Sequence, residues 1–164
     1  MAAPFSTADL SDAFASRCVS CAEQFVRYGG RRIFSGRIRT VACREDNALI
    51  RRLLETPSPG EVLVVDGGGS LGAALLGDVL AGLGLGNGWS GVVIHGAVRD
   101  VRALATINFG VKALGTNPLR SNKLGTGLID SVVTFGGVAF NPGHSLYSDD
   151  DGILVSPERL SRLF

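Results

Sequence analysis

Residues 61–78 read EVLVVDGGGSLGAALLGD, and residues 88–101 read GWSGVVIHGAVRDV. Each stretch contains a run of apolar, mostly β-branched residues, within EVLVVD at 61–66 and GVVIH at 91–95. Such runs are typical of strands that are buried on both faces of a parallel sheet. The two stretches therefore predict two neighbouring core strands.

The segments that follow these strands predict helices. Residues 71–76 (LGAALL) are expected to form the first helix, and Gly77 ends it because glycine disfavours a helix interior. Asp78 then acts as the N-cap of a second helical stretch, VLAGLG. Residues 101–107 (VRALATI) predict another helix after the second strand. Strands that alternate with helices in this way indicate an α/β fold.

The rest of the chain adds elements without a division. No linker or change of composition separates parts of it, so we expect a single compact α/β domain over residues 1–164. In chain order we predict helix 7–16, strand 33–43 with a kink at Gly36, helix 47–55 capped by Asp46, strand 111–115, a hairpin of 132–135 and 138–140, strand 153–156 and a terminal helix after Ser156.

Composition excludes several classes of protein. The 164 residues are 45% hydrophobic and 19% charged, which suits a packed core and not a disordered chain. The chain has 16 Lys and Arg and 15 Asp and Glu, which gives a net charge of +1. It is therefore not a strongly basic nucleic-acid-binding protein. No apolar stretch reaches the roughly 18 residues of a membrane helix, and the N-terminus lacks a basic start. We expect a cytoplasmic protein with three reduced cysteines and no direct nucleic-acid or membrane contact.

Two short motifs resemble ligand-binding loops but lack the residues that would complete them. Gly67-x-Gly69-x-x-Gly72 matches GxGxxG after a strand, yet no acid follows about 20 residues later, as a dinucleotide-binding fold requires. The run DDDG at 149–152 lacks the spacing and the closing Glu of a calcium loop. Dinucleotide binding is therefore disfavoured, and the acidic run predicts a solvent-exposed turn.

Arg99 and Asp100 come directly after a predicted core strand, where α/β folds place their ligands. The planar fork of an arginine can bind a carboxylate through two hydrogen bonds. An aspartate can hold a hard divalent cation such as Mg²⁺, whose other positions stay with water and substrate oxygens. The alternative is a surface arginine beside an ordinary helix-capping aspartate.

The segment from Gly77 to Leu80 is a second candidate. A helix that begins there exposes unpaired backbone N–H groups and the positive end of its dipole, to which a carboxylate can bind. Glycine within an apolar helical pattern costs about 1 kcal/mol relative to alanine, so Gly77 needs a structural or functional reason. The alternative is a glycine needed for packing and an ordinary cap at Asp78.

Taken together, these residues resemble the RraA-like family, which contains the regulator of ribonuclease activity A and the class II 4-hydroxy-4-methyl-2-oxoglutarate (HMG) aldolases. The resemblance extends from about Thr7 to Ser156. It implies a swivelling β/β/α domain in a ring-shaped homotrimer, sometimes doubled to a hexamer, with aldolase active sites between subunits. The matching segments are YGGRRIFSGRIRTV, EDNALIRRLL, EVLVVDGGGSLGAALLGD, GWSGVVIHGAVRDV, GVKALGTNP, FGGVAFNPG and YSDDDGILVS.

The aldolases of this family carry the motif D-X20-R-D-X2-E/D. Asp78 and Arg99 are separated by 20 residues, and Asp100 follows at once, so D-X20-R-D is present. The last acid is absent, because Ala103 stands in its place.

The resemblance also implies a role for each matching residue. Asp100 binds a divalent metal, Mg²⁺ or Mn²⁺, and Arg99 holds the pyruvoyl oxygens of a small 2-oxo acid. Asp78 positions a water that protonates the departing enolate. The substrate carboxylate is bound by the backbone N–H groups of Gly77, Asp78, Val79 and Leu80.

Two functions of different class follow from the resemblance. The first is a metal-dependent lyase that cleaves HMG to pyruvate, decarboxylates oxaloacetate, or does both, through a metal-stabilised pyruvate enolate. The second is a non-catalytic inhibitor that binds an RNase E-type endoribonuclease. The presence of Asp78, Arg99 and Asp100 favours the enzyme, while the regulator remains the alternative.

Overall fold

Strand β3, Phe34–Ala42, joins two differently built parts of one sheet. In the computed structural model, which describes residues 4–160, the first half of β3 pairs antiparallel with β11, Ser145–Ser148. The second half of β3 pairs in parallel with β4, Val62–Asp66. Gly36 lies in the first half, and a side chain there would overlap the carbonyl oxygen of Gly60. The glycine predicted as a kink is thus required by a close approach of two backbones.

The other elements complete this sheet and cover it. The helices are α1 (Thr7–Ala13), α2 (Ala48–Leu54), α3 (Asp78–Gly86) and α4 (Val101–Leu104). The other strands are β1 (Val19–Ser20), β2 (Val26–Arg27), β5 (Ala74–Leu76), β6 (Gly91–Val98), β7 (Gly110–Thr116), β8 (Leu128–Ile129), β9 (Val133–Phe135), β10 (Val138–Phe140) and β12 (Ile153–Ser156). The strand order is β1–β12–β11–β3–β4–β6–β7–β2, with β5 beside β6, β8 beside β3, and β9–β10 as a separate hairpin.

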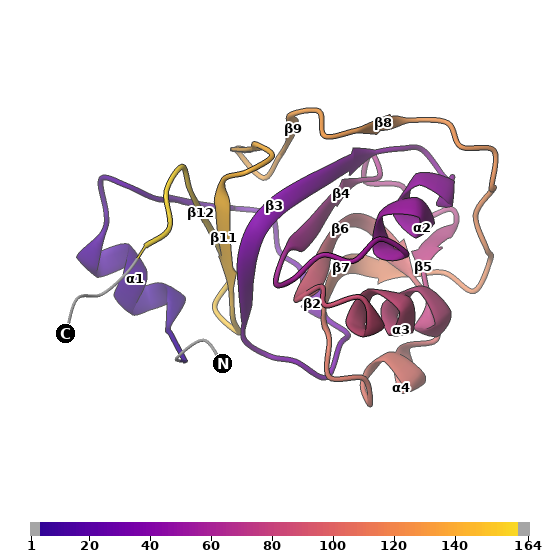
Figure 1. The fold of residues 1–164 in the computed structure, drawn as a ribbon, viewed down its shortest axis with the longest axis horizontal. Coiled ribbons are helices and arrows are strands. Elements are labelled where there is room, and N and C mark those ends of the chain that lie inside the picture. Colours follow the sequence, from indigo (N-terminus) through magenta and orange to yellow (C-terminus); the bar gives the residue numbers. More distant parts are fainter. Residues whose placement is uncertain (1–3, 161–164) are drawn as a thin grey trace.

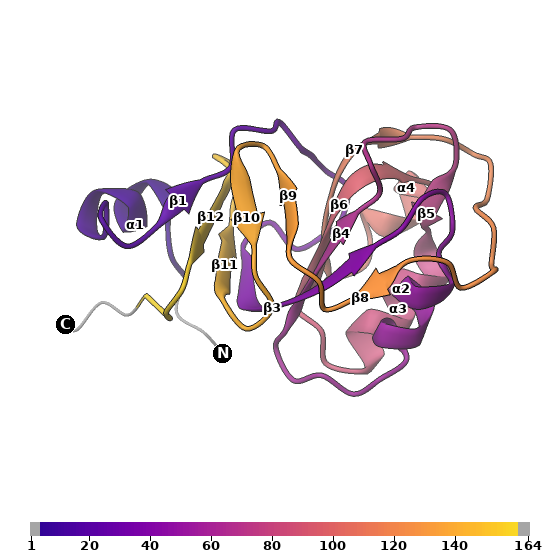
Figure 2. The same ribbon diagram turned by 90° about the horizontal axis from the view of Figure 1, so that it is seen from above.

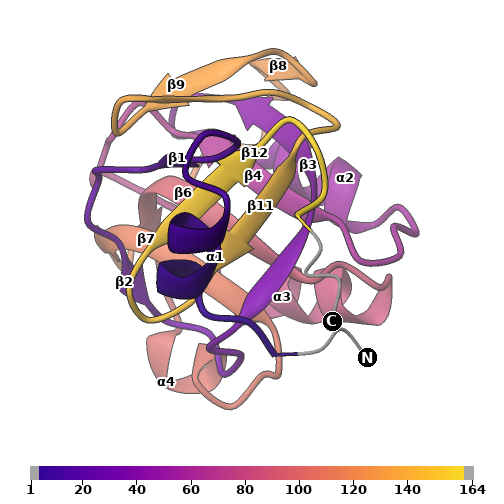
Figure 3. The same cartoon turned by 90° about the vertical axis from the view of Figure 1, so that its left-hand side faces the viewer.

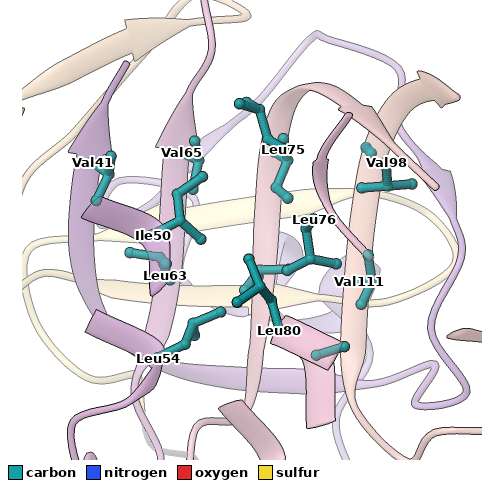
Figure 4. Packing of buried hydrophobic residues seen from close by; sticks show 14 of the residues in the cluster. Val41, Ile50, Leu54, Leu63, Val65, Leu75, Leu76, Leu80, Val98 and Val111 are labelled. Atoms are coloured by element: carbon teal, nitrogen blue, oxygen red, sulfur yellow. The ribbon is translucent and has the colours of Figure 1, made fainter. Parts of the chain in front are cut away.

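The side chains of β4 alternate between two hydrophobic clusters, because successive residues of a strand point to opposite faces. Leu63 and Val65 belong to the cluster beneath α2 and α3, which Figure 4 shows. Val62 and Val64 belong to a second cluster, which includes the β9–β10 hairpin. All four side chains are fully buried, which explains the continuous apolar run in the sequence.

Different helices pack beside the parallel and the antiparallel parts of the sheet. Helices α2, α3 and α4 lie beside the parallel strands, while α1 lies at the far end, beside β11 and β12 (Figures 1 and 2). Helix α1 crosses over these two strands in Figure 3, and Leu10 packs in a small cluster with Tyr147 and Leu154.

Helix α1 is anchored by Asp149, whose carboxylate accepts hydrogen bonds from the Thr7 N–H and hydroxyl at 2.7 and 2.6 Å. The acidic run predicted as an exposed turn does connect β11 to β12, but Asp149 itself is buried. That part of the prediction was wrong because the carboxylate of Asp149 faces Thr7 and not solvent.

The helix predicted at 71–76 is a strand. Residues Ala74–Leu76 form β5, which pairs in parallel with β6, and Ala73 to Leu76 are all buried. A short apolar run fits a buried strand and a buried helix equally well, so its periodicity does not distinguish them.

Other predictions differ from the structure mainly at their ends. The predicted strands at 33–43, 61–66, 91–95, 111–115 and 153–156 and the hairpin are confirmed within a few residues. The helix predicted at 101–107 ends after one turn at Leu104, and the helix at 7–16 ends at Ala13. Strand β11 was not predicted, and residues 157–160 form no helix. The rest of the predicted terminal helix lies outside the described residues.

Asp46 holds the long segment between β7 and β9. The residue is 1% exposed. Burial would raise the pKa of this carboxyl, but its hydrogen bonds outweigh burial and lower the pKa to about 2. The N-cap of α2 is Asn47, one residue after the predicted Asp46, but the Asp46 carboxylate still accepts from the first N–H of the helix and also fixes a distant loop. Its donors are the N–H groups of Ala48, Leu124, Gly125 and Thr126 and the Thr126 hydroxyl.

Replacing Asp46 by asparagine is expected to lower the free energy of unfolding by about 3 kcal/mol, since an amide NH₂ then faces N–H donors. The pKa of Asp46 is lower in the folded chain than the roughly 3.9 of an unfolded aspartate. Its stabilisation is therefore present above about pH 4 and is lost as the pH falls towards 2. Urea unfolding at pH 7 and pH 3 tests both points. Equal stability of wild type and Asp46→Asn at pH 7 would contradict this role.

Candidate functional site

Two turns meet at the carboxyl ends of the neighbouring parallel strands β5 and β6. Strand β5 leads through Gly77 into α3, and β6 leads through Arg99 and Asp100 into α4, beside α3 in Figure 1. Leu76 and Val98 are partners in the ladder, and the Arg99 N–H donates to the Leu76 carbonyl at 2.9 Å. The structure thus brings the predicted site residues together, at the strand ends where α/β sheets bind ligands.

Asp100 adopts a left-handed backbone conformation, with φ 58° and ψ 39°. Asparagine, aspartate and glycine enter this region more readily than other residues. The turn keeps the Asp100 side chain from capping its own helix, α4. Its Oδ2 atom instead accepts a hydrogen bond from the Asp78 N–H at 3.2 Å, at the start of α3. Asp100 is thus the N-cap residue of α4, as the alternative had it, but its side chain forms no capping hydrogen bond to that helix.

Gly77 is the N-cap of α3, and Asp78 is the first helical residue, so the helix begins one residue earlier than the predicted cap at Asp78 implied. The backbone of Gly77 is extended, with φ −135°, so its conformation does not require glycine. The requirement is steric, since a Cβ at Gly77 would overlap Asp100 Oδ2 and approach Arg99 Cγ to 3.3 Å. The absence of a side chain at Gly77 is what lets the two turns touch.

Arg99 points its guanidinium across the surface beside Asp100. Its Nη1 donates to the Pro118 carbonyl at 3.3 Å, and its Nε lies 3.9 Å from Asp100 Oδ2. The side chains of Arg99 and Asp100 are 41% and 40% exposed. Most donors of the guanidinium therefore remain available to a ligand.

The first turn of α3 faces the same surface. Leu80 is buried in the core and anchors the helix, while Asp78 and Val79 are exposed. The first N–H groups of a helix have no partner within it and lie at the positive end of the dipole. A carboxylate at this point would meet backbone donors and the Arg99 cation together.

Asp100 could hold a hard divalent cation, because an exposed carboxylate is the ligand type that Mg²⁺ and Mn²⁺ prefer. Within residues 4–160, no group of three or more Asp, Glu, His or Cys side chains is arranged to bind a metal. A cation at Asp100 would therefore take most of its ligands from water, substrate or another chain. Ala103 offers no oxygen from its side chain.

The segment Asn117 to Leu119 was not predicted as part of the site. It reaches Arg99 through the Pro118 carbonyl. The sequence signal was the TNP turn directly after the predicted strand at 111–115, at the same edge of the sheet.

The GxGxxG loop, His95 and the three cysteines are not assigned to this site. The GxGxxG loop leads into strand β5 and not into a helix, so it lacks the helix N-terminus on which a dinucleotide phosphate would rest. His95 stacks on Phe135 and lies 3.5 Å from Glu23 and 3.8 Å from Asp66. The three cysteines are free, and burial raises the pKa of Cys43 to about 12.

Comparison with known proteins identifies the family of this chain. A model of the RraA-like family, described as Aldolase/RraA, matches residues 7–155. The chain belongs to the RraA-like family. A relative from Aromatoleum aromaticum is 53% identical over 156 residues, 95% of this chain and 98% of its own length. It is named "Putative 4-hydroxy-4-methyl-2-oxoglutarate aldolase".

Similar solved structures confirm the expected α/β fold. RraA of Thermus thermophilus, titled an RNA-processing inhibitor, superposes with a TM-score of 0.92 at 45% identity, over 99% of this chain and 98% of that one. A protein of Geobacillus kaustophilus gives a TM-score of 0.94 at 48% identity, over 95% and 97%. That structure is titled an S-adenosylmethionine:2-dimethylmenaquinone methyltransferase.

The three relatives carry three different functional names on one fold. Fold therefore identifies the family, while the reaction has to be argued from the site. None of the helices in residues 4–160 is long and apolar enough to span a bilayer.

Proposed function

We propose that this RraA-like chain is a divalent-metal-dependent carbon–carbon lyase that releases pyruvate from HMG, from oxaloacetate, or from both. The observation that carries the proposal is the convergence of Arg99, Asp100 and the N-terminus of α3 on one surface, which Gly77 makes possible. The name of the Aromatoleum relative supports an aldolase at the level of the family.

The donor set suits a hard cation. Asp100 would hold Mg²⁺ or Mn²⁺ through its carboxylate, and Asp78, exposed at the start of α3, would act through the surrounding water. When bound, the cation supplies Lewis acidity at the 2-oxo group of the substrate.

The protein groups have separate tasks. The Asp78 N–H donates to Asp100, so the N–H groups of Val79 and Leu80 at the start of α3 bind the substrate carboxylate, which fixes the position of the 2-oxo group. The Arg99 guanidinium donates hydrogen bonds to the oxygen on which negative charge develops as the carbon–carbon bond breaks. Asp78 positions the water that returns a proton to the enolate carbon.

Ala103 affects the two reactions differently. Decarboxylation of oxaloacetate releases CO₂ and needs no base, whereas cleavage of HMG requires removal of a hydroxyl proton. The family motif has an acid where this chain has Ala103. The proposal therefore includes a preference for oxaloacetate decarboxylation over HMG cleavage.

We further propose that the site is completed in a homotrimer. Arg99 and Asp100 are partly exposed, and two chain neighbours of site residues are exposed apolar side chains, Val79 at 64% and Leu119 at 61%. Such side chains favour contact with another protein surface. Size-exclusion chromatography with light scattering tests the assembly.

Pyruvate release by the purified protein tests the function. Oxaloacetate and HMG are supplied in turn with Mg²⁺ or Mn²⁺, and a coupled dehydrogenase detects pyruvate. Release above a blank of the same metal without protein supports the lyase. A folded oligomer that turns over neither substrate would refute it.

Arg99→Lys is expected to lower kcat/KM by about 100-fold, because lysine lacks the planar fork that binds two oxygens at once. Steady-state kinetics with oxaloacetate measure the loss, and circular dichroism confirms the fold. Turnover comparable to the wild type would show that Arg99 does not hold the substrate.

The second candidate function is inhibition of an RNase E-type endoribonuclease. Its support is the 45% identity to the Thermus RraA that is titled an RNA-processing inhibitor. Binding of the purified chain to an RNase E-type enzyme, together with no pyruvate release, would favour this function. The two functions can coexist, because the inhibitor would act by binding its partner through its surface and would not need catalytic turnover.

A further inference from the structure

The side chain of Arg99 has little packing to hold it. It is 41% exposed, and its described polar neighbours are the Pro118 carbonyl and the Asp100 carboxylate. A free arginine side chain carries roughly 2 kcal/mol of rotamer entropy. A ligand that needs two parallel hydrogen bonds from the guanidinium therefore depends on whatever fixes its plane.

The Pro118 carbonyl is such a support, because it accepts from one end of the fork and leaves the other donors free. Pro118 is itself exposed, and the next side chain, Leu119, is 61% exposed. Packing does not fix this carbonyl, so hydrogen bonds to neighbouring residues must do so.

Asn117 makes those hydrogen bonds in three directions. Its N–H donates to the Val98 carbonyl at 3.1 Å, and its Nδ2 donates to the Leu71 carbonyl at 2.7 Å. Its Oδ1 accepts from the Leu119 N–H at 2.9 Å, which closes a turn around Pro118. The side chain thus binds the segment before β5 and shapes the turn that carries the carbonyl.

We propose that Asn117 is a positioning residue that orients the Arg99 guanidinium for its substrate through the Pro118 carbonyl. This inference rests on the proposed lyase function. It goes beyond the D-X20-R-D residues by assigning a role to a side chain on a third strand end, that of β7.

A purely structural role is the competing explanation. The Ala74 N–H donates to the Leu119 carbonyl at 2.7 Å, so the same turn also helps to hold β5 in place. A structural role would lower activity regardless of the residue at position 99. A positioning role requires the arginine, because it acts on the plane of the fork.

The test is a double-mutant cycle of Asn117→Ala and Arg99→Lys, read as kcat/KM for oxaloacetate with Mg²⁺. With Arg99 present, Asn117→Ala should lower kcat/KM about tenfold or more, as expected for a displaced catalytic group. In the Arg99→Lys background the same change should stay within about twofold. A tenfold loss in both backgrounds would overturn the positioning role.

Binding provides a second measurement that does not depend on turnover. Oxalate is planar and resembles the enolate of pyruvate, so it should bind the wild type and weaken about tenfold in Asn117→Ala. Calorimetry with Mg²⁺ present measures this affinity. Unchanged oxalate affinity would contradict the inference.

Two further variants control for folding. Asn117→Ser retains an oxygen that can accept from the Leu119 N–H, so it should lose less activity than alanine. Asn108→Ala removes another exposed asparagine side chain, which accepts from Arg31 at 3.4 Å, and should leave kinetics unchanged. If Asn117→Ala fails to fold, the cycle is run with serine, and equal losses in both backgrounds again overturn the proposal.

A wild type without turnover would refute both the lyase and this inference. Turnover of the wild type with additive losses in the variants would refute the inference alone.

Discussion

Asp100→Asn is expected to abolish metal-dependent pyruvate release, with a loss of about 1000-fold or more in kcat/KM. Asparagine tolerates the left-handed backbone of Asp100, at φ 58°, and keeps an oxygen for the Asp78 N–H. The change therefore removes the charge and leaves the turn intact. Asp100→Ala should be equally inactive and about 1 kcal/mol less stable, because alanine is strained in this conformation.

Asp130→Asn is the matched control. Asp130 also has φ 58°, and it forms two hydrogen bonds with Arg39 on strand β3, at 3.0 and 2.9 Å. Its replacement should cost at most about 1 kcal/mol of stability and leave turnover unchanged. If a folded Asp100→Asn variant decarboxylates oxaloacetate as fast as the wild type, the assignment of Asp100 is wrong.

Gly77→Ala is expected to lower kcat/KM by about 100-fold without unfolding the chain. The added Cβ would overlap Asp100 Oδ2, which is the end of a movable side chain, so Asp100 can rotate away at small cost to the fold. That rotation breaks the hydrogen bond to the Asp78 N–H and moves the carboxylate from its place beside Arg99.

Gly82→Ala is the control that separates the overlap with Asp100 from the general effect of an alanine in a helix. Gly82 lies in the same helix, α3, and a Cβ there would meet no atom within 4 Å. This control should keep full activity and gain up to about 1 kcal/mol of stability from helix propensity. Kinetics and thermal unfolding of both variants measure the difference. Equal activity of Gly77→Ala and Gly82→Ala would contradict the steric role of Gly77.

The position of the site could be predicted from the sequence because it depends on chain connectivity. Arg99 and Asp100 follow a run that reads as a buried strand, and parallel strands end at the same edge of a sheet. The helix that starts beside Asp78 was also predicted, since Gly77 interrupts an apolar pattern. Both inferences use only local sequence and the rules of α/β folds.

The contacts within the site could not be predicted, because they depend on the pairing of β5 with β6. The run LGAALL was predicted as a helix, whereas its second half is strand β5, and the turns after the paired strands β5 and β6 bring Asp100 to the N–H of Asp78. The same holds for Asp46, whose partners Leu124 and Thr126 lie about 80 residues away along the chain. Long-range hydrogen bonds of this kind leave no periodic signal.

The most direct test of the metal-dependent lyase is removal and return of the cation. Pyruvate release from oxaloacetate is followed with Mg²⁺, after treatment with excess EDTA, and after Mg²⁺ is restored, with the Asp100→Asn protein as the blank for catalysis by free metal. We expect the wild type to lose turnover with EDTA and to recover it fully with Mg²⁺. The Asp100→Asn protein should show neither change. Pyruvate release that continues unchanged in EDTA, or that equals the rate of the Asp100→Asn protein at every step, would contradict the proposed function.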